Sequence, residues 1–412
     1  AMLGRIFHHQ HRNPDMTTPD FDQIIDRIGT GCSKWDDMEA IYGVPPDRGI
    51  AMWVADMDFR PPEAVQRAVE AIAAHGIYGY PAHHGTSPAY LDAIRWWMAH
   101  RHGWELRPDW ILSAHGLVNG TALCIDTFTS PGDAVILMTP VYHAFSRVIR
   151  AADRRVTEFP LVIRDGLYRM DWKGWARRLT GRERMLILCS PHNPGGRVWS
   201  PDELREVAAF CKAHDLLLVS DEIHHDLVMP DAPRHTVLAC AAPDAAPRLV
   251  TLSAATKTFN IAGAHLGNLI VADDDLRARL AGRLAALAIS PGLFGPAMVT
   301  AAYSPEGAAW VDRLVAYLDG NRRLFEEGVN RVPGLRAMPA QATYLAWVDF
   351  AGTGLSRAEF TARVEREALI AANHGPSFGT GGETWLRFNL ATPRDVVTEA
   401  VERLKLAFAD LQ

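Results

Sequence analysis

Three short apolar runs, each followed at once by polar residues, constrain the fold of this 412-residue chain more than any other feature. They occupy residues 185–189, 216–219 and 249–252, and residues 202–211 between the first two have the apolar spacing of a helix. Continuous apolar runs of this length, separated by helical stretches, are typical of buried parallel strands. Alternating strand and helix signals extend from about residue 62 to residue 291. The sequence therefore predicts an α/β fold with a mostly parallel sheet between helices.

Polar side chains follow each of the three runs. Asn193 comes after the first run, Asp221 after the second and Lys257 after the third. Open α/β sheets bind ligands at the carboxyl ends of their strands, so we expect these three side chains to converge on one site. Taken singly, each has a plainer interpretation. Asp221 could cap a helix, residues 193–196 could be a simple turn, and Lys257 could be a solvated surface amine.

Together the three side chains match the needs of a pyridine-ring cofactor that carries an aldehyde. Lys257 lies among small and apolar residues, which lower its pKa and make available the neutral amine that forms an imine. An aspartate facing the ring nitrogen keeps that nitrogen protonated, so that the ring can accept electrons. An asparagine amide can donate to the phenolic oxygen of the ring. The lysine, once released from the imine, is free to move protons.

Several ordered motifs resemble the fold type I pyridoxal 5'-phosphate (PLP) enzymes of the class I/II aminotransferase superfamily. These motifs are SPHNPGG at residues 190–196, SDEIH at 220–224 and TKTFN at 256–260. KWD at 34–36 and MWVADMDF at 52–59 are similar to signatures of the MalY/PatB-type cystathionine β-lyase, or C–S lyase, branch. The match runs from about residue 21 to the carboxyl end. It implies a large domain with a mostly parallel seven-stranded sheet between helices, a smaller α+β domain, and PLP as the cofactor.

The resemblance also implies contacts to the ring and the phosphate of PLP. Gly116, Leu117 and Val118 lie where a helical pattern begins after residues 110–113, so the amides after Gly116 can face a phosphate at a helix start. Tyr142 matches the tyrosine that stacks on the pyridine ring. An aromatic residue in a loop after a strand is otherwise more often a packing residue.

Two residues near Lys257 complete the implied phosphate contacts. Thr256 and His265 stand where the superfamily often has a hydroxyl and a basic group. Ala254 replaces a serine of many relatives, and His265 replaces an arginine of many aminotransferases, so phosphate anchoring should differ in detail. His265 has an alternative role as an ordinary hydrogen-bonded histidine. Tyr80 resembles the tyrosine that reaches the phosphate from the neighbouring subunit, which implies a homodimer with shared active sites.

Substrate contacts follow from the resemblance too. Arg387 matches the arginine that binds the α-carboxylate of the substrate, a task that suits its planar, two-pronged donors, and Asn193 is expected beside it. The alternative for Arg387 is a surface ion pair, but its strand neighbours are apolar. Trp53 and Asp56 lie in the segment that marks the branch. They either border the substrate or form a packed domain junction.

The implied reaction is α,β-elimination of L-cystathionine or a related cysteine S-conjugate to pyruvate, ammonia and a thiol. Lys257, Tyr142 and Asp221 are the expected catalytic residues. Two alternatives stay open. One is an aminotransferase of amino acids, because the two reactions share their first steps, and the other is a PLP-binding regulatory protein that acts through protein contacts.

The length of the chain indicates more than one domain, because single cores usually stop growing below this size. We assign a large PLP-binding domain to residues 62–303 and a discontinuous small domain to residues 21–61 and 304–412. A helical pattern over residues 304–327 is expected to link them. Residues 1–20 lack the apolar core of a signal peptide and are interpreted as a flexible amino-terminal extension.

Composition excludes several other classes of function. The net charge of −6 does not favour nucleic-acid binding, and no apolar run approaches the roughly 18 residues of a membrane helix. The five cysteines are scattered without the spacing of metal ligands, so neither a disulfide framework nor a zinc site is expected. We therefore expect a cytoplasmic enzyme that acts on a small amino-acid substrate, with no metal, nucleic-acid or membrane partner.

Overall fold

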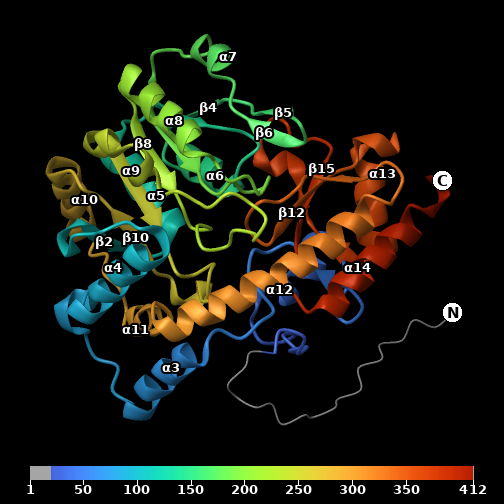
Figure 1. The fold of residues 1–412 in the computed structure, drawn as a ribbon, viewed down its shortest axis with the longest axis horizontal. Coiled ribbons are helices and arrows are strands. Elements are labelled where there is room, and N and C mark those ends of the chain that lie inside the picture. Colours follow the sequence, from blue (N-terminus) through green and yellow to red (C-terminus); the bar gives the residue numbers. More distant parts are fainter. Residues whose placement is uncertain (1–19, 412) are drawn as a thin grey trace.

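The largest feature of the computed structural model, which describes residues 20–411, is a seven-stranded sheet (Figure 1). Its strand order is β2-β10-β9-β8-β7-β3-β4, and β10 runs in the direction opposite to the other six strands. The strands are β2 (Ile111–Ala114), β3 (Ala134–Leu137), β4 (Arg155–Glu158), β7 (Glu183–Cys189), β8 (Leu217–Asp221), β9 (Leu249–Ser253) and β10 (Gly267–Ile270). The predicted α/β fold is confirmed, and the three apolar runs form the central strands β7, β8 and β9.

Helices cover both faces of this sheet. Successive residues of a strand point to opposite sides, so each strand packs side chains against both layers of helices. Met185 and Ile187 of β7 pack with helices on one face, whereas Leu186 and Leu188 pack with helices on the other. The first face carries α5 (Leu117–Phe128), α6 (His143–Ala151) and α10 (Asp274–Ala286), and the second carries α8 (Pro201–Ala213) and α9 (Leu238–Ala241). With both faces buried, the central strands β7, β8 and β9 contain continuous apolar runs rather than alternating apolar and polar residues.

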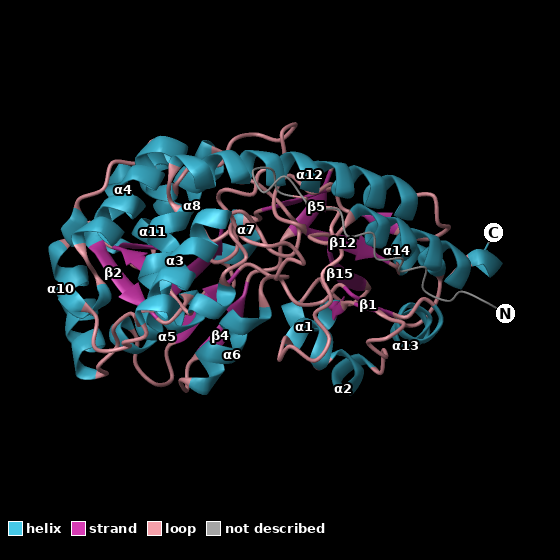
Figure 2. Ribbon diagram, turned by 90° about the horizontal axis from the view of Figure 1, so that it is seen from below, coloured by secondary structure: helices cyan, strands magenta, loops and turns pink. Residues whose placement is uncertain are grey.

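A second, antiparallel sheet lies at the other end of the molecule (Figure 2). Its order is β11-β12-β15-β14, formed by β11 (Arg336–Ala337), β12 (Leu345–Asp349), β15 (Trp385–Asn389) and β14 (Asn373–His374). The helix α14 (Arg394–Ala407) packs on this sheet, and apolar residues of both belong to one cluster. The short strand β1 (Ile50–Ala51) pairs in parallel with β13 (Ile370–Ala371), so a segment near the amino end belongs to this part of the molecule.

The long helix α12 (Pro305–Val329) runs alongside both sheets (Figure 1). The Ser304 side chain caps its first turn. Trp310 and Leu314 belong to an apolar cluster beside the large sheet, whereas Phe325 and Val329 pack with residues of the small sheet. The helix therefore joins the two parts, as the sequence predicts.

The other elements flank these layers or connect them. They are α1 (Ser33–Asp36), α2 (Met38–Tyr42), α3 (Glu63–His75), α4 (Pro88–His102), α7 (Trp172–Ala176), α11 (Phe294–Ala302), α13 (Arg357–Ala362), β5 (Val162–Arg164) and β6 (Leu167–Arg169). Between residues 20 and 411, no helix is long and apolar enough to cross a membrane. The extension predicted at residues 1–20 lies, apart from residue 20, outside the described residues. The division into domains at residues 61 and 303 stays a prediction.

Candidate active site

Asn193, Asp221 and Lys257 lie at the same edge of the large sheet. Asp221 is the last residue of β8, and the other two follow β7 and β9 by four residues each. These strands are neighbours, with Cys189 opposite Asp221 and Asp221 opposite Leu252. The parallel register therefore brings the turns after the three strands together, as predicted from the order of the motifs.

Lys257 lies in the turn that follows β9. Its Nζ donates a hydrogen bond to the carbonyl oxygen of Ala55. Burial lowers the pKa of Lys257 to about 8, although the negative charges of Asp56 and Asp221 oppose this shift. A substantial fraction of this amine is therefore neutral near physiological pH, which is the form that attacks an aldehyde or accepts a proton.

Asp221 is a buried carboxylate whose side chain has one hydrogen-bond partner in the described chain. Its Oδ1 accepts the backbone N–H of Ile223 at 3.2 Å, and the residue is 5% exposed. Burial raises the pKa of Asp221 to about 7, with a further rise from Glu222, while Lys257 opposes the change. No ion pair to Asp221 is formed within residues 20–411. A buried carboxylate in this state gains stability from a bound cation.

Arg387 on β15 is the complementary case of a buried cation. It is 2% exposed, and its two terminal nitrogens donate to Asn193 Oδ1 at 3.0 Å, to the Trp53 carbonyl at 2.9 Å and to Asn373 Oδ1. Within the described chain its Nε has no hydrogen-bond partner and no carboxylate pairs with it. Burial lowers the pKa of Arg387 to about 10, and this arrangement favours binding of a carboxylate ligand.

Tyr142 lies at the start of α6, near the charged groups of Arg387 and Asp221. Burial raises the pKa of its phenol, while Arg387 lowers it and Asp221 raises it, so the phenol is within electrostatic reach of both. Its ring packs edge-on against Phe145, with the centroids 5.5 Å apart. The predicted aromatic residue is therefore at the same edge of the sheet as Asp221.

Trp53 and Asp56 belong to a segment whose backbone carbonyls are bound by side chains from distant parts of the chain. We call residues 53–57 the carbonyl loop. The donors are Arg387 to Trp53, Asn389 to Val54 and Asp56, Lys257 and Tyr344 to Ala55, Lys34 to Asp56, and Arg27 and Asn260 to Met57. Because the loop binds both Lys257 and Arg387, it is a packed junction that also borders the candidate site.

A group of ion pairs, in which Lys34 and Asp58 are buried and Arg27 and Asp56 partly exposed, also holds the carbonyl loop. The Lys34 ammonium lies 2.7 Å from Asp58 and 3.8 Å from Asp56, and Arg27 lies 2.8 Å and 3.0 Å from the same carboxylates. Trp35 Nε1 also donates to Asp58 at 3.1 Å. Burial alone would raise the pKa of Asp58, but Lys34 and Arg27 lower it below its ordinary value. The KWD motif and the longer signature therefore meet in space.

The predicted phosphate-binding residues lie around the start of α5. Gly116 precedes the helix with φ 84° and ψ 166°, a backbone conformation that favours glycine. A Cβ on Gly267 of β10 would lie 2.5 Å from a methyl carbon of Leu117, so the absence of a side chain there lets the strand approach the helix start. Val118 is half-buried in the same turn. The amides of this turn are therefore presented at a helix amino end.

The remaining predicted contacts differ in their exposure. Thr256 is 8% exposed, whereas the His265 side chain is exposed and makes no hydrogen bond within the described chain. Tyr80 is fully exposed, and nearby Ile77 and Tyr78 are also exposed. No part of residues 20–411 covers Tyr80, so its predicted role requires a second copy of the chain.

Two side chains at this site carry no assigned role in the sequence analysis. His224, within the SDEIH motif, is 2% exposed, and its Nδ1 has no hydrogen-bond partner in the described chain. Burial lowers the pKa of His224 to about 3, and the positive charges of Lys257 and Arg387 lower it further. Its position three residues after Asp221 was the available signal, because side chains that follow a strand end share that end of the sheet.

Asn260 is the second residue without a predicted role. Its Oδ1 accepts the N–H of Met57 at 2.8 Å, and its Nδ2 donates to the carbonyls of Met57 at 2.8 Å and Phe59 at 2.9 Å. It therefore fastens the turn that carries Lys257 to the carbonyl loop. Sequence alone offers only its nearness to Lys257, because its partners lie some 200 positions away.

The chemistry of this donor set fits PLP. A lysine amine with a lowered pKa, a buried carboxylate that forms no ion pair within residues 20–411, and the amides of Leu117 and Val118 at a helix start are the groups that an aldehyde, a protonated pyridine and a phosphate require. The orphaned Nε of Arg387 supplies a donor for a carboxylate that belongs to another molecule. The residues present therefore suit the cofactor and an amino-acid substrate together.

Comparisons with known proteins agree with this reading of the site. The family model described as aminotransferase class I and II matches residues 52–404. Cystathionine beta-lyase PatB of Bacillus subtilis (strain 168) is 35% identical over 395 residues, which cover 94% of this chain and 100% of that protein.

Two solved structures that contain PLP superpose on nearly the whole chain. Cystalysin from Treponema denticola, which contains a pyridoxal 5'-phosphate cofactor, has a TM-score of 0.90 and 33% identity, covering 95% of this chain and 99% of that one. The PLP-bound C-S lyase from Staphylococcus hominis has a TM-score of 0.86 and 27% identity, covering 94% and 98%.

Proposed function

We propose, from the premise that this chain belongs to the aminotransferase class I and II family, that it is a PLP-dependent C–S β-lyase. The fold is that of the fold type I PLP enzymes, and the cofactor is pyridoxal 5'-phosphate. The reaction is the elimination of a thiol from L-cystathionine or a related cysteine S-conjugate, after which water hydrolyses the remaining enamine to pyruvate and ammonia. The observation that carries the proposal is a buried amine, carboxylate and guanidinium at one sheet edge.

The residues of the chain have separate tasks in this proposal. When bound, PLP supplies an electron-withdrawing ring that accepts the electron pair released as the α-carbon to hydrogen bond of the substrate breaks. Asp221 keeps a proton on the ring nitrogen, and Asn193 donates to the phenolic oxygen. Tyr142 packs against the ring face. The amides that follow Gly116, those of Leu117 and Val118, bind the phosphate, with Thr256 and His265 as further contacts.

Arg387 and Lys257 act on the substrate. The guanidinium of Arg387 binds the α-carboxylate, with Asn193 and the carbonyl of Trp53 fixing its orientation. The amine of Lys257 takes the α-proton, the bond from the β-carbon to sulfur breaks, and the departing sulfur is protonated. A pKa of about 8 suits this amine to both halves of the proton transfer near neutral pH. Asp56 lies close enough to Lys257 to affect its charge.

The names of the relatives favour the lyase over the aminotransferase. PatB is a cystathionine beta-lyase and the Staphylococcus hominis protein is a C-S lyase, and both are matched over more than nine-tenths of this chain. An aminotransferase of amino acids is the second candidate, since the family model carries that description. A PLP-binding regulator that acts through protein contacts would keep the cofactor without needing rapid turnover.

One assay separates these candidates. Purified enzyme is supplied with L-cystathionine in the absence of any keto acid, and pyruvate and free thiol are measured. The lyase is expected to form both products in equal amounts. Turnover that starts only after a keto acid is added would identify the aminotransferase. A stable visible cofactor band with turnover in neither assay would favour the regulator.

A homodimer with shared active sites is part of the same proposal. Tyr80, Tyr78 and Ile77 form an exposed strip on the loop after α3, and Phe294 lies beside Tyr78 with the ring centroids 6.1 Å apart. An exposed apolar strip of this kind is suited to a second copy of the chain. We also propose a cytoplasmic location, which rests on the scattered, unpaired cysteines.

A further inference from the structure

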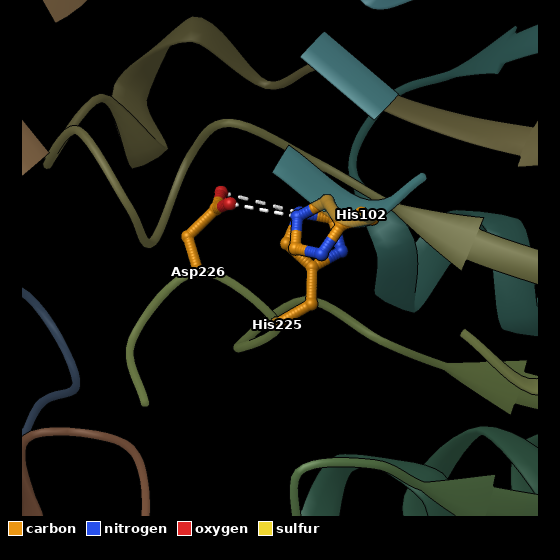
Figure 3. A group of neighbouring side chains, drawn as sticks. All are labelled: His102, His225 and Asp226. Carbon is orange, nitrogen blue, oxygen red and sulfur yellow. Dashed lines mark hydrogen bonds and ion pairs between the residues drawn. The ribbon is translucent and has the colours of Figure 1, made fainter. Parts of the chain in front are cut away.

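Asp226 is the centre of a buried polar cluster with His102 and His225 (Figure 3). Its side chain and that of His225 are fully buried, and that of His102 is 6% exposed. The Asp226 carboxylate accepts from His102 Nε2 at 2.8 Å, from Trp97 Nε1 at 3.1 Å and from the hydroxyl of Thr258 at 2.9 Å. His225 Nε2 lies 3.2 Å from its second oxygen. These partners come from three separate parts of the chain.

The cluster contains residue types that bind metal ions, but its carboxylate oxygens already accept hydrogen bonds. The ligand atoms of His102, His225 and Asp226 lie within 4.8 Å of one another. Both carboxylate oxygens are, however, already occupied: His102 and Trp97 donate to one, and Thr258 and Trp97 to the other. A carboxylate filled by such donors is a hydrogen-bonded anion. The geometry therefore indicates that Asp226 is an anchor, meaning a buried anion that holds neighbouring segments in place through hydrogen bonds.

The charges around Asp226 agree with this role. Burial alone would lower the pKa of His225, but the negative charge of Asp226 raises it above the ordinary value. Burial lowers the pKa of His102 to about 4, so His102 is neutral and donates its Nε2 hydrogen. Burial would raise the pKa of Asp226, yet His225 and the donated hydrogen bonds lower it well below the usual range.

The position of Thr258 gives the anchor a functional meaning. Thr258 directly follows Lys257, and Asp226 follows Asp221 by five residues on the segment after β8. One hydrogen bond between Thr258 and Asp226 therefore joins the two segments that carry the reactive amine and the buried carboxylate. The same carboxylate is fixed to α4 through Trp97 and His102. The other side of the lysine turn is held by Asn260.

We propose that Asp226, acting through Thr258, is a positioning residue for Lys257. The hydrogen bond sets the placement of the lysine turn relative to the Asp221 segment, so that amine and carboxylate meet one cofactor in a fixed relation. A misplacement of about 1 Å at a reacting group can reduce a rate about 100-fold. The inference rests on the proposed function in that it takes Lys257 as the reactive amine.

Three variants of buried threonines test this role. Thr258→Val removes the hydroxyl with little change of shape, and Thr258→Ser keeps the hydroxyl. Thr251→Val is the matched control, because Thr251 on β9 is 1% exposed and its hydroxyl has no hydrogen-bond partner in the described chain. We expect Thr258→Val to reduce kcat about 10- to 100-fold with KM changed less than about twofold. Thr258→Ser and Thr251→Val should stay close to wild type.

A second readout does not depend on turnover. The visible band of the bound cofactor is titrated with pH in the absence of substrate. The other charged or titratable groups around Asp226 are the same in all three variants; they are Arg101, His102, Glu222, His225, His235 and Tyr303. A shift of the titration midpoint by about half a pH unit in Thr258→Val alone therefore reports a changed environment of Lys257.

The outcomes are distinct. If Thr258→Val matches Thr251→Val in kcat and in the titration midpoint, the positioning role is wrong, whatever its melting temperature. If Thr258→Val does not fold, His102→Phe removes another donor to Asp226. This variant should lower kcat and shift the titration midpoint, and no change in either would overturn the proposal. One equivalent of zinc that copurifies with the holoenzyme and is lost in His102→Phe would also overturn it. A wild-type enzyme without lyase activity would contradict the proposed function, while the titration would still decide the role of Asp226.

Discussion

At the scale of single residues, the candidate site consists of ionisable groups that burial has moved toward their neutral forms. The pKa of Lys257 falls to about 8, that of Asp221 rises to about 7 and that of Arg387 falls to about 10. In each case burial is the largest cause. Groups with perturbed pKa values that lie together in this way are typical of functional sites. Structural ion pairs show a different pattern, because they stabilise the charged forms. Lys34 and Asp58 show that second pattern.

Replacing Asp221 by Asn should stabilise the apoenzyme while weakening cofactor binding. The folded apoenzyme holds a proton on Asp221 up to about pH 7, whereas the unfolded chain releases it near pH 4. The free energy of unfolding of the wild type therefore falls as pH rises across that window. Apo Asp221→Asn should exceed apo wild type by about 1 to 4 kcal/mol at pH 7.5, with the difference vanishing near pH 4.

Urea unfolding of both apoproteins at several pH values measures this effect. The exposed Asp47→Asn variant serves as a control for loss of a carboxylate, and it should show no such window. With cofactor present, the order of stability should reverse, because a neutral amide in place of the Asp221 carboxylate cannot pair with a positive ring nitrogen. A pH-independent difference between Asp221→Asn and wild type would contradict the assignment of the shifted group.

Arg387→Lys tests the two-pronged carboxylate contact while keeping the positive charge. Lysine cannot donate in a planar pair, so binding of the α-carboxylate should weaken and KM should rise about 10- to 100-fold. The spectrum and affinity of the cofactor should change little. Steady-state kinetics and cofactor titration measure the two quantities. An equal loss of substrate and cofactor affinity would show that Arg387 supports the cofactor site as a whole.

At the scale of elements, the carbonyl loop is the piece that joins the two sheets at the candidate site. It receives Arg387 and Asn389 from β15 of the small sheet, and Lys257 and Asn260 from the turn after β9 of the large sheet. A change in its backbone would therefore move the substrate-binding and amine-bearing elements relative to each other. This explains why a segment that lacks an obvious catalytic group marks the branch.

Asn260→Gly should loosen this junction without backbone strain. Asn260 has φ 54°, which glycine adopts readily, so the variant removes three hydrogen bonds while keeping the turn allowed. We expect a loss of roughly 2 to 4 kcal/mol in the free energy of unfolding and a lower kcat. Asp165→Gly is the matched control, because Asp165 has the same φ and lies exposed in the β5–β6 turn. Similar stabilities for the two variants would refute the fastening role of Asn260.

At the scale of the whole molecule, the candidate site is incomplete if Tyr80 serves a neighbouring subunit. Tyr80 is fully exposed in the protomer, whereas Asp221, Thr256 and Arg387 of the candidate site are buried. Coexpression of Lys257→Ala chains with Tyr80→Ala chains tests this arrangement. A mixed dimer would then have one site with both residues intact and one with neither. We expect purified mixed dimers to recover about half of the wild-type activity, although each parent dimer is impaired.

Differently tagged chains allow the mixed dimers to be isolated and assayed. If Tyr80 instead acts within its own chain, no site in the mixed dimer has both residues and activity stays at the level of the parents. If the protein elutes as a monomer with full activity, the shared site itself is refuted. Both results can be distinguished by size-exclusion chromatography followed by the pyruvate assay.

The sequence by itself determined the sheet and the residues at its edge. Apolar runs at 185–189, 216–219 and 249–252 are buried on both faces, so they identify strands without reference to distant partners. Asn193, Asp221 and Lys257 then follow from their places after those strands. Arg387 could be assigned because the resemblance extends to the carboxyl end.

The tertiary structure alone decided which side chains hold those residues in place. Asp226 meets Thr258 and Trp97, and Asn260 meets Met57 and Phe59, across separations of tens to hundreds of positions. No periodicity in the chain records such pairings, because a hydrogen bond between distant segments depends on how strands and helices stack and not on local sequence. The groups with which Lys257 is proposed to act were thus visible in the sequence, whereas the contacts that fix its placement required the fold.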